Sequence, residues 1–90
     1  MIIRSQDKKS IINFDNIEAV KLNEIQISIS NDRWYFEIRY YNFKEDGELL
    51  GIYSTYEKAI KVMDMIQKRY CEFCCNEFCS VFEMPQDSEV

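Results

Sequence analysis

The sequence predicts one α+β domain over residues 1–90: a curved antiparallel sheet of about five to six short strands, covered by one long helix in the C-terminal half. Two observations predict this class. β-Branched and aromatic segments separated by polar turns fill the first half, and a single segment with helical periodicity follows them. The length of 90 residues, with 47 % hydrophobic and 30 % charged residues, fits one small globular domain with a modest core.

Three short strands are expected before the middle of the chain. Apolar segments at residues 2–4 and 11–14 flank a polar turn, and residues 17–22 form a third β-branched segment. Asn and Glu at residues 23–24 are expected to end that strand, since both residue types are rare in strands.

The clearest alternation lies in two segments, residues 25–30 and 33–43, joined by the turn-forming residues 31–32. Apolar side chains occupy every second position in both segments, which is typical of half-buried strands. We therefore expect a hairpin. The helix is expected to bury its apolar face, which consists of Ile27, Ile29, Phe36 and Ile38, with Trp34 and Tyr40 on the same side.

A turn at residues 44–47 and a strand at residues 48–53 precede the helix. Ser54 and Glu57 have the spacing of a capping box, in which the hydroxyl accepts a backbone N–H and the glutamate reaches back. We expect the helix from about residue 56 to 70. Its apolar stripe consists of Tyr56, Ala59, Ile60, Met63, Ile66 and Tyr70, with Val62 at the margin.

After the helix, a Cys-rich loop and a short final strand at residues 80–84 are expected. Pro85 ends this strand because proline has no N–H to donate to a ladder. The polar residues 85–90 are expected to form a frayed tail.

Histidine is absent, which excludes His-dependent nucleophilic machinery and His-ligated metals. The two glycines form neither a Walker loop nor a dinucleotide fingerprint. We therefore expect a protein that is not an enzyme.

No apolar run reaches the length of a transmembrane helix and no signal-peptide core is present, so we expect a cytoplasmic protein of a bacterial host cell.

The four cysteines, Cys71, Cys74, Cys75 and Cys79, lie within nine residues. Disulfides are disfavoured inside cells, so clustered thiols indicate a metal, with Zn²⁺ first because thiolates bind it tetrahedrally. Adjacent cysteines seldom both reach one ion, and Glu72 or Glu77 is the alternative to Cys75. The cysteines could instead be free and buried, form a disulfide pair, or hold an iron–sulfur cluster. A metal here would fix the exit of the chain from the helix.

The negative charge is uneven. The formal net charge is −5: residues 1–70 carry 11 basic and 11 acidic residues, and residues 71–90 carry five acidic residues and no basic one. An acidic surface repels nucleic acid and attracts basic protein surfaces. The residues expected to contact such a partner are Asp46, Glu48, Glu72, Glu77 and Glu83. A purely solubilising role for the acidic end is the alternative.

A second candidate surface is aromatic. Tyr35, Tyr41 and Tyr53 are candidates for a patch that faces a partner, since tyrosine is common at interface hot spots. The alternative is that they cover the sheet, as aromatic residues in strands often do.

Three segments together resemble a family of small proteins of Gram-positive phages and mobile elements: IRSQDK at residues 3–8, LGIYSTYEKAI at residues 50–60 and FEMPQD at residues 82–87. Within that setting, the small size, acidity and cysteine cluster resemble the anti-CRISPR proteins of type II systems. This resemblance implies an inhibitor that binds Cas9 and blocks DNA loading or cleavage. From the acidity and the lack of a long apolar run we also expect no direct binding of nucleic acid or membranes, and we expect a monomer. The alternative is a non-enzymatic protein-interaction module with a pleckstrin-like sheet.

Overall fold

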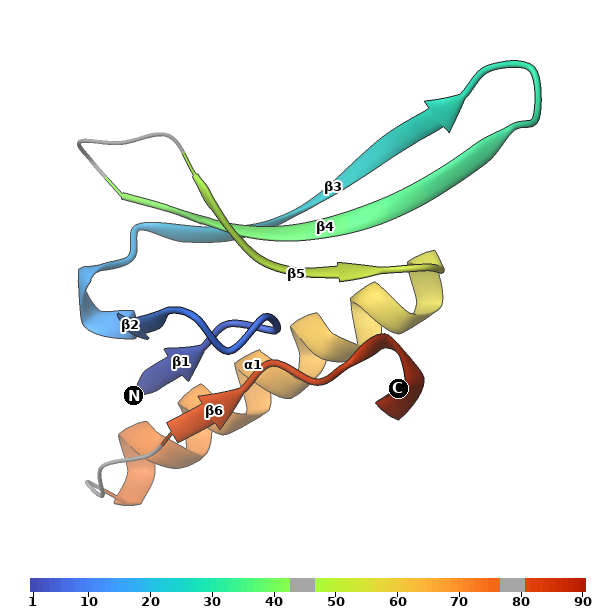
Figure 1. Ribbon diagram of the computed structural model, residues 1–90. Coiled ribbons are helices and arrows are strands. Elements are labelled where there is room, and N and C mark those ends of the chain that lie inside the picture. The colour runs from blue at the N-terminus through green and yellow to red at the C-terminus, as the bar shows by residue number, and fades with distance from the viewer. Residues whose placement is uncertain (43–46, 77–80) are drawn as a thin grey trace.

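A computed structural model describes residues 1–42, 47–76 and 81–90, with the side chains of residues 73–76 outside the description. The α+β class with one helix is confirmed (Figure 1). The turn predicted at residues 44–47 falls mostly outside the described residues. Along the chain the elements are β1 (Ile2–Arg4), β2 (Ile11–Asn13), the 3-10 helix η1 (Phe14–Asn16), β3 (Ala19–Ser28), β4 (Arg33–Tyr41), β5 (Glu48–Tyr53), α1 (Tyr56–Asn76), β6 (Val81–Glu83) and the 3-10 helix η2 (Asp87–Glu89).

The described strands form two sheets of three strands each, in the orders β2-β1-β6 and β3-β4-β5. The prediction of one curved antiparallel sheet of five to six strands is therefore wrong, and β1 pairs with β6 in parallel. The chain leaves the first sheet at η1, which Asn13 caps by accepting a hydrogen bond from the Asp15 N–H at 3.0 Å. That turn directs the chain away from β2, so β3 begins a separate sheet.

β3 is one strand of ten residues, and the break predicted at residues 23–24 does not occur. Asn23 pairs with Glu37 of β4, and Glu24 pairs with Phe36. The Asn23 side chain donates a hydrogen bond to the Tyr41 hydroxyl at 3.1 Å, which satisfies the amide within the sheet. Tertiary pairing therefore overrides the low strand propensity of these two residues.

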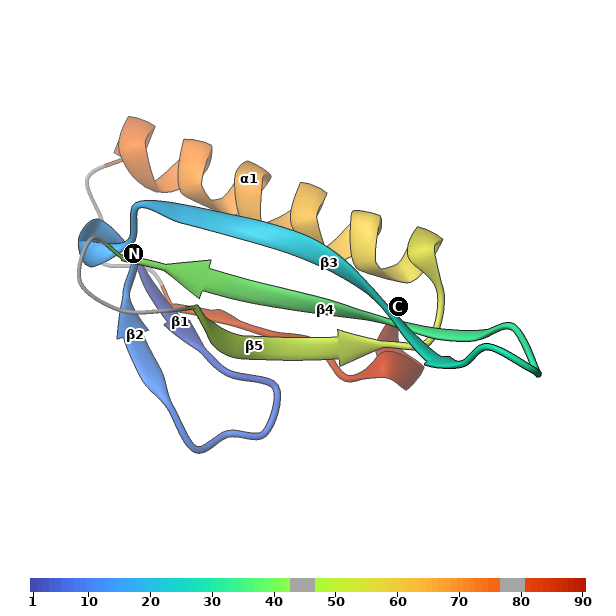
Figure 2. The ribbon, with the colours of Figure 1, turned by 90° about the horizontal axis from the view of Figure 1, so that it is seen from above.

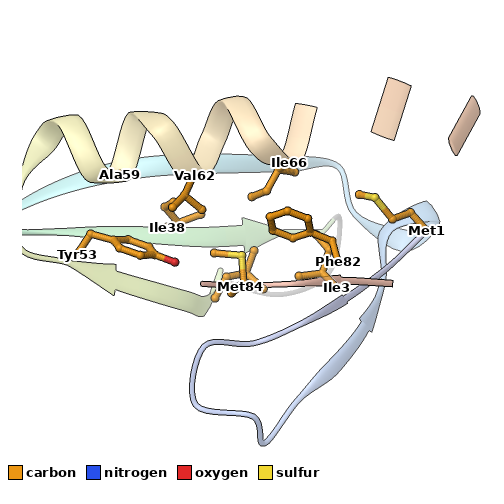
Figure 3. Close-up of a cluster of buried hydrophobic side chains, with 10 residues drawn as sticks. Met1, Ile3, Ile38, Tyr53, Ala59, Val62, Ile66, Phe82 and Met84 are labelled. Atoms are coloured by element: carbon orange, nitrogen blue, oxygen red, sulfur yellow. The ribbon is translucent and has the colours of Figure 1, made fainter. Parts of the chain in front are cut away.

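The core lies where α1 and sheet β2-β1-β6 meet one face of sheet β3-β4-β5 (Figures 1 and 3). Val62 and Ile66 of α1 point toward Ile38 of β4 in the close-up, and Ala59, one helical turn before Met63, is fully buried as well. Val62 is fully buried, so it belongs to the centre of the apolar stripe and not to its margin. The buried core consists of Met1, Ile3, Ile38, Leu50, Tyr53, Ala59, Val62, Ile66, Phe82 and Met84.

The prediction that the helix buries Ile27 and Ile29 is wrong, since these side chains are 57 % and 87 % exposed. Directly opposed residues of an antiparallel pair lie on the same face, and Ile25 is opposite Tyr35 whereas Leu22 is opposite Ile38. The Ile25 position therefore faces away from α1. Past a register shift at residues 26–28, the hairpin extends beyond the helix (Figure 2).

α1 begins at Tyr56, and its capping hydroxyl belongs to Thr55, which accepts the Lys58 N–H at 3.2 Å. The helix continues to Asn76, six residues past the predicted end, because neither Gly nor Pro interrupts this segment. Among the described residues, no helix combines the length and the apolar composition needed to cross a membrane.

The three segments that carry the family resemblance converge. The Gln6 side chain accepts the Ile52 N–H at 2.8 Å and donates to the carbonyls of Ile52 at 3.0 Å and Pro85 at 3.2 Å. Gln86 donates its amide to the Gln6 carbonyl at 2.7 Å, and the buried Tyr53 hydroxyl donates to Pro85 at 2.8 Å. These motifs therefore join the first turn, β5 and the C-terminal segment, which is a structural role.

The C-terminal segment, predicted to be frayed, is hydrogen bonded to the start of α1. The Asp87 carboxylate accepts the Ser54 N–H at 2.7 Å and its hydroxyl at 3.0 Å. It also lies 3.3 Å from the Lys58 ammonium. A carboxylate beside a helix N-terminus is stabilised by the positive end of the helix dipole. The Asp87 side chain of this segment thus binds to the start of α1. Ser54, the predicted cap of the helix, instead donates its hydroxyl to Asp87.

Asp87→Asn is expected to destabilise the protein by about 1 kcal/mol at neutral pH, a modest value because the carboxylate is 42 % exposed and solvent screens it. Hydrogen bonds from the Ser54 backbone, and then from the Ser54 and Lys58 side chains, hold the pKa of Asp87 below its usual value. A lowered folded-state pKa gives stabilisation that is present above the unfolded-state pKa of about 3.9 and is lost as the pH falls through the folded-state pKa.

Urea denaturation of wild type and Asp87→Asn over this acidic range checks the expectation: the two stabilities should converge as the pH falls. Asp64→Asn, on the exposed surface of α1, is the control and should keep the wild-type pH dependence. If the free energies of unfolding of wild type and Asp87→Asn stayed equally far apart as the pH falls, the stabilising role of the Asp87 carboxylate would be contradicted.

Candidate interaction surfaces

Three of the four cysteine positions, 71, 74 and 75, lie on α1, so the prediction that these three belong to a loop after the helix is wrong. Cys71 is exposed, and residues 74 and 75 belong to the last two turns of α1. Their side chains, and all of Cys79 and Glu77, lie outside the described residues. In a helix, positions three and four residues apart are neighbours on one face. Positions 71, 74 and 75 therefore share one side of the helix end.

Within the described residues, no three Cys, Asp or Glu side chains converge on a point that could hold a metal ion. Because three of the four cysteine side chains lie outside that part, the zinc prediction stays a prediction. The donor set itself suits the ion, since thiolates are strong zinc ligands and histidine is absent from the chain.

The carboxylates predicted to bind a partner lie on separate elements, and Asp46 is outside the described residues. Glu48 of β5 accepts the Tyr40 hydroxyl at 2.8 Å. Glu72 of α1 lies 4.0 Å from Arg69, and Glu83 of β6 lies 3.7 Å from Lys8. Each described carboxylate of this set thus has an intramolecular partner. Glu72 and Glu83 remain more than half exposed in their side chains, so both stay accessible to a second protein.

The face of sheet β3-β4-β5 that lies away from α1 is called the outer face (Figure 2). At its centre Glu37 is buried, and its carboxylate pairs with Arg39 at 2.6 Å. Arg39 also donates to the Gly47 carbonyl at 3.1 Å, so the guanidinium joins β4 to the start of β5. By register, the face includes Lys21, Asn23, Ile25, Tyr35, Glu37, Arg39, Tyr41, Leu49 and Ile52.

Two of the three tyrosines predicted as a partner-facing patch lie on the outer face. Tyr35 and Tyr41 are half-buried there, and the Lys21 ammonium lies 5.2 Å from the centre of the Tyr41 ring. Tyr53 is instead in the core, where burial, with smaller contributions from Asp87 and Glu89, raises the pKa of its hydroxyl well above the usual range. Leu49 and Ile52 add exposed apolar area.

An apolar groove of about 400 Å³ runs between α1 and β3, and is called the α1–β3 groove. The Phe14 and Tyr70 rings meet there with centroids 4.9 Å apart. The groove is lined by Phe14, Val20, Met63, Asp64, Ile66, Gln67 and Tyr70.

Sequence reasoning missed the groove and the Glu37–Arg39 pair. The pair had a visible signal, since opposite charges two residues apart in a strand lie on one face. The groove had no such signal in the sequence, because it depends on η1 turning Phe14 toward the helix end.

Comparison of the chain with models of protein families, with curated proteins and with solved structures finds no match.

Proposed function

We propose that this protein is a non-enzymatic inhibitor that binds a nucleic-acid-handling protein through a basic surface of that partner, most specifically a type II Cas9, and blocks DNA loading or cleavage. The observation that carries the proposal is the charge of residues 71–90, five acidic residues and no basic one. Cas9 holds its heteroduplex in a positively charged channel, which an acidic protein can occupy.

The exposed carboxylates of Glu72 and Glu83 are the contacts we propose among the described residues. Their present partners, Arg69 and Lys8, are surface cations, and such pairs are weak in water. A basic channel can therefore attract these carboxylates with little loss of stability in the protein.

The test is cleavage of a DNA target by purified Cas9 with increasing amounts of this protein, at low and high salt. We expect inhibition at low salt that weakens as salt screens the charges. Glu72→Lys and Glu83→Lys should weaken inhibition, whereas Ile52→Ser on the outer face should not. Undiminished cleavage at saturating protein, with no co-elution at low salt, would reject the Cas9 proposal.

The outer face supports a second candidate, a non-enzymatic interaction module that docks an apolar protein surface on sheet β3-β4-β5. Tyrosine and exposed apolar residues surround an ion pair there in which Glu37 is buried and Arg39 is half-buried, and tyrosine and arginine are common at interface hot spots. This candidate predicts that Cas9 cleavage is unaffected and that pull-down from a host extract recovers a partner other than Cas9. Ile52→Ser should weaken capture of that partner, whereas the two glutamate reversals should not, and salt should have little effect.

We also propose that the cysteines bind one structural Zn²⁺. Support comes from the thiol-rich donor set and from positions 71, 74 and 75 sharing one side of α1. The metal would tie the end of α1 to the segment that leads into β6.

A further inference from the structure

β3 is an edge strand. In the sheet order β3-β4-β5 it pairs with β4 on one side, and no strand in the described part of the chain pairs with its other side. An edge strand presents a row of N–H and C=O groups that can pair with another chain. At ten residues, β3 is the longest strand described.

The α1–β3 groove adjoins this edge. Val20 of β3 lines it, and the opposite lining comes from Met63, Ile66 and Tyr70 of α1. Its volume of about 400 Å³ and its mostly apolar lining suit buried aliphatic or aromatic side chains. A strand added to β3 would direct every second side chain toward the α1 side of the sheet.

Two carboxylates border this site. Asp64 lines the groove, and Glu24 of β3 is opposite Phe36, which faces α1 and contacts Tyr56. Both acidic residues are exposed. The side of β3 that carries the groove is thus apolar with a negative border.

We propose that the β3 edge binds an extended cationic segment of a partner protein by strand addition. Apolar side chains at alternate positions of the segment enter the α1–β3 groove, and its Lys or Arg side chains lie beside Asp64 and Glu24. This inference deepens the proposed function and rests on it, since it names the form and chemistry of the segment that is bound. The backbone pairing supplies affinity and the groove supplies selectivity.

The charge of the chain favours such a segment over a second copy. Each copy carries a formal charge of −5, so two copies repel one another, whereas a cationic segment is attracted. Joining two β3 edges would also bring the Glu24 and Asp64 carboxylates of both copies to one interface, and like charges close together oppose pairing.

The experiment selects random nine-residue peptides on the immobilised full-length protein and titrates the winners into ¹⁵N-labelled protein. We expect winners with apolar residues at alternate positions and Lys or Arg between them. Amide shifts should concentrate in β3, η1 and the groove face of α1. Asp64→Lys and Glu24→Lys should each weaken binding about fivefold, and Glu48→Lys, on the opposite edge of the same sheet, should not.

Four outcomes would each overturn the inference: no enrichment of peptides, apolar residues at helical spacing in the selected peptides, amide shifts on the β5 edge or the outer face, or a dimer formed through β3. Far-UV circular dichroism of the variants confirms that they fold. The two proposals can fail separately. If peptides bind β3 but the protein does not inhibit Cas9, Cas9 is rejected as the partner. If the double variant Glu24→Lys with Asp64→Lys still inhibits Cas9, strand addition at β3 is rejected.

Discussion

Ile38→Ala is expected to lower the free energy of unfolding by about 3 kcal/mol, the usual loss when a buried isoleucine leaves a cavity. Ile38 is fully buried in β4, beneath Val62 and Ile66 of α1 (Figure 3). It lies where the helix meets both sheets, so few neighbours are free to move into the space. For a chain of this length the loss is a large fraction of a total stability of roughly 5–10 kcal/mol.

Chemical denaturation measures the change, with Ile27→Ala as the matched control. The same side chain is removed in both variants, but Ile27 is 57 % exposed in the hairpin beyond the helix. We expect a change within about 0.5 kcal/mol for the control. Similar losses at both positions would contradict the register described for β3 and β4.

This pair of variants also marks the limit of sequence-based prediction for the hairpin. The alternation that begins at Ile25 correctly predicts a strand as far as Ser28, because a period of two is a local property, but Ile29 lies beyond the end of β3. The alternation does not say which face is buried. That choice depends on Leu22 pairing opposite Ile38 and on where α1 crosses the sheet, and both are long-range contacts.

The two-sheet arrangement could not be predicted for a related reason. β1 and β6 are three residues each, and their parallel pairing joins the two ends of the chain. Nothing local in either segment identifies its neighbour. Of the candidate site residues, Glu72 and Glu83 are exposed, and their role as partner contacts stays a prediction. The outer face and the α1–β3 groove required knowledge of the fold, because each joins residues from three elements.

Removing zinc is the perturbation with the largest expected effect. If the proposed site holds the ion, its binding energy counts as folding energy, on the order of 10 kcal/mol in small zinc domains, which is comparable to the whole stability of such a chain. We expect the purified protein to carry one zinc per chain, and a strong chelator to release it with loss of helical circular dichroism. Elemental analysis and a colorimetric zinc indicator measure the metal, and the melting temperature reports the stability.

Single variants identify the ligands. Cys71→Ser should release zinc and lower the melting temperature, because Cys71 is positioned on α1 beside positions 74 and 75. Cys75→Ser, Glu72→Gln and Glu77→Gln separate the three candidates for the fourth ligand. Zinc should be lost from the variant that lacks the true ligand and retained in the other two. Protein purified without metal, with four freely titratable thiols and a melting temperature indifferent to chelator, would contradict the site. The helix end would then be held by the Arg69 contacts to Glu72 and to the Val81 carbonyl, at 4.0 and 3.3 Å, which lie in the described part of the chain.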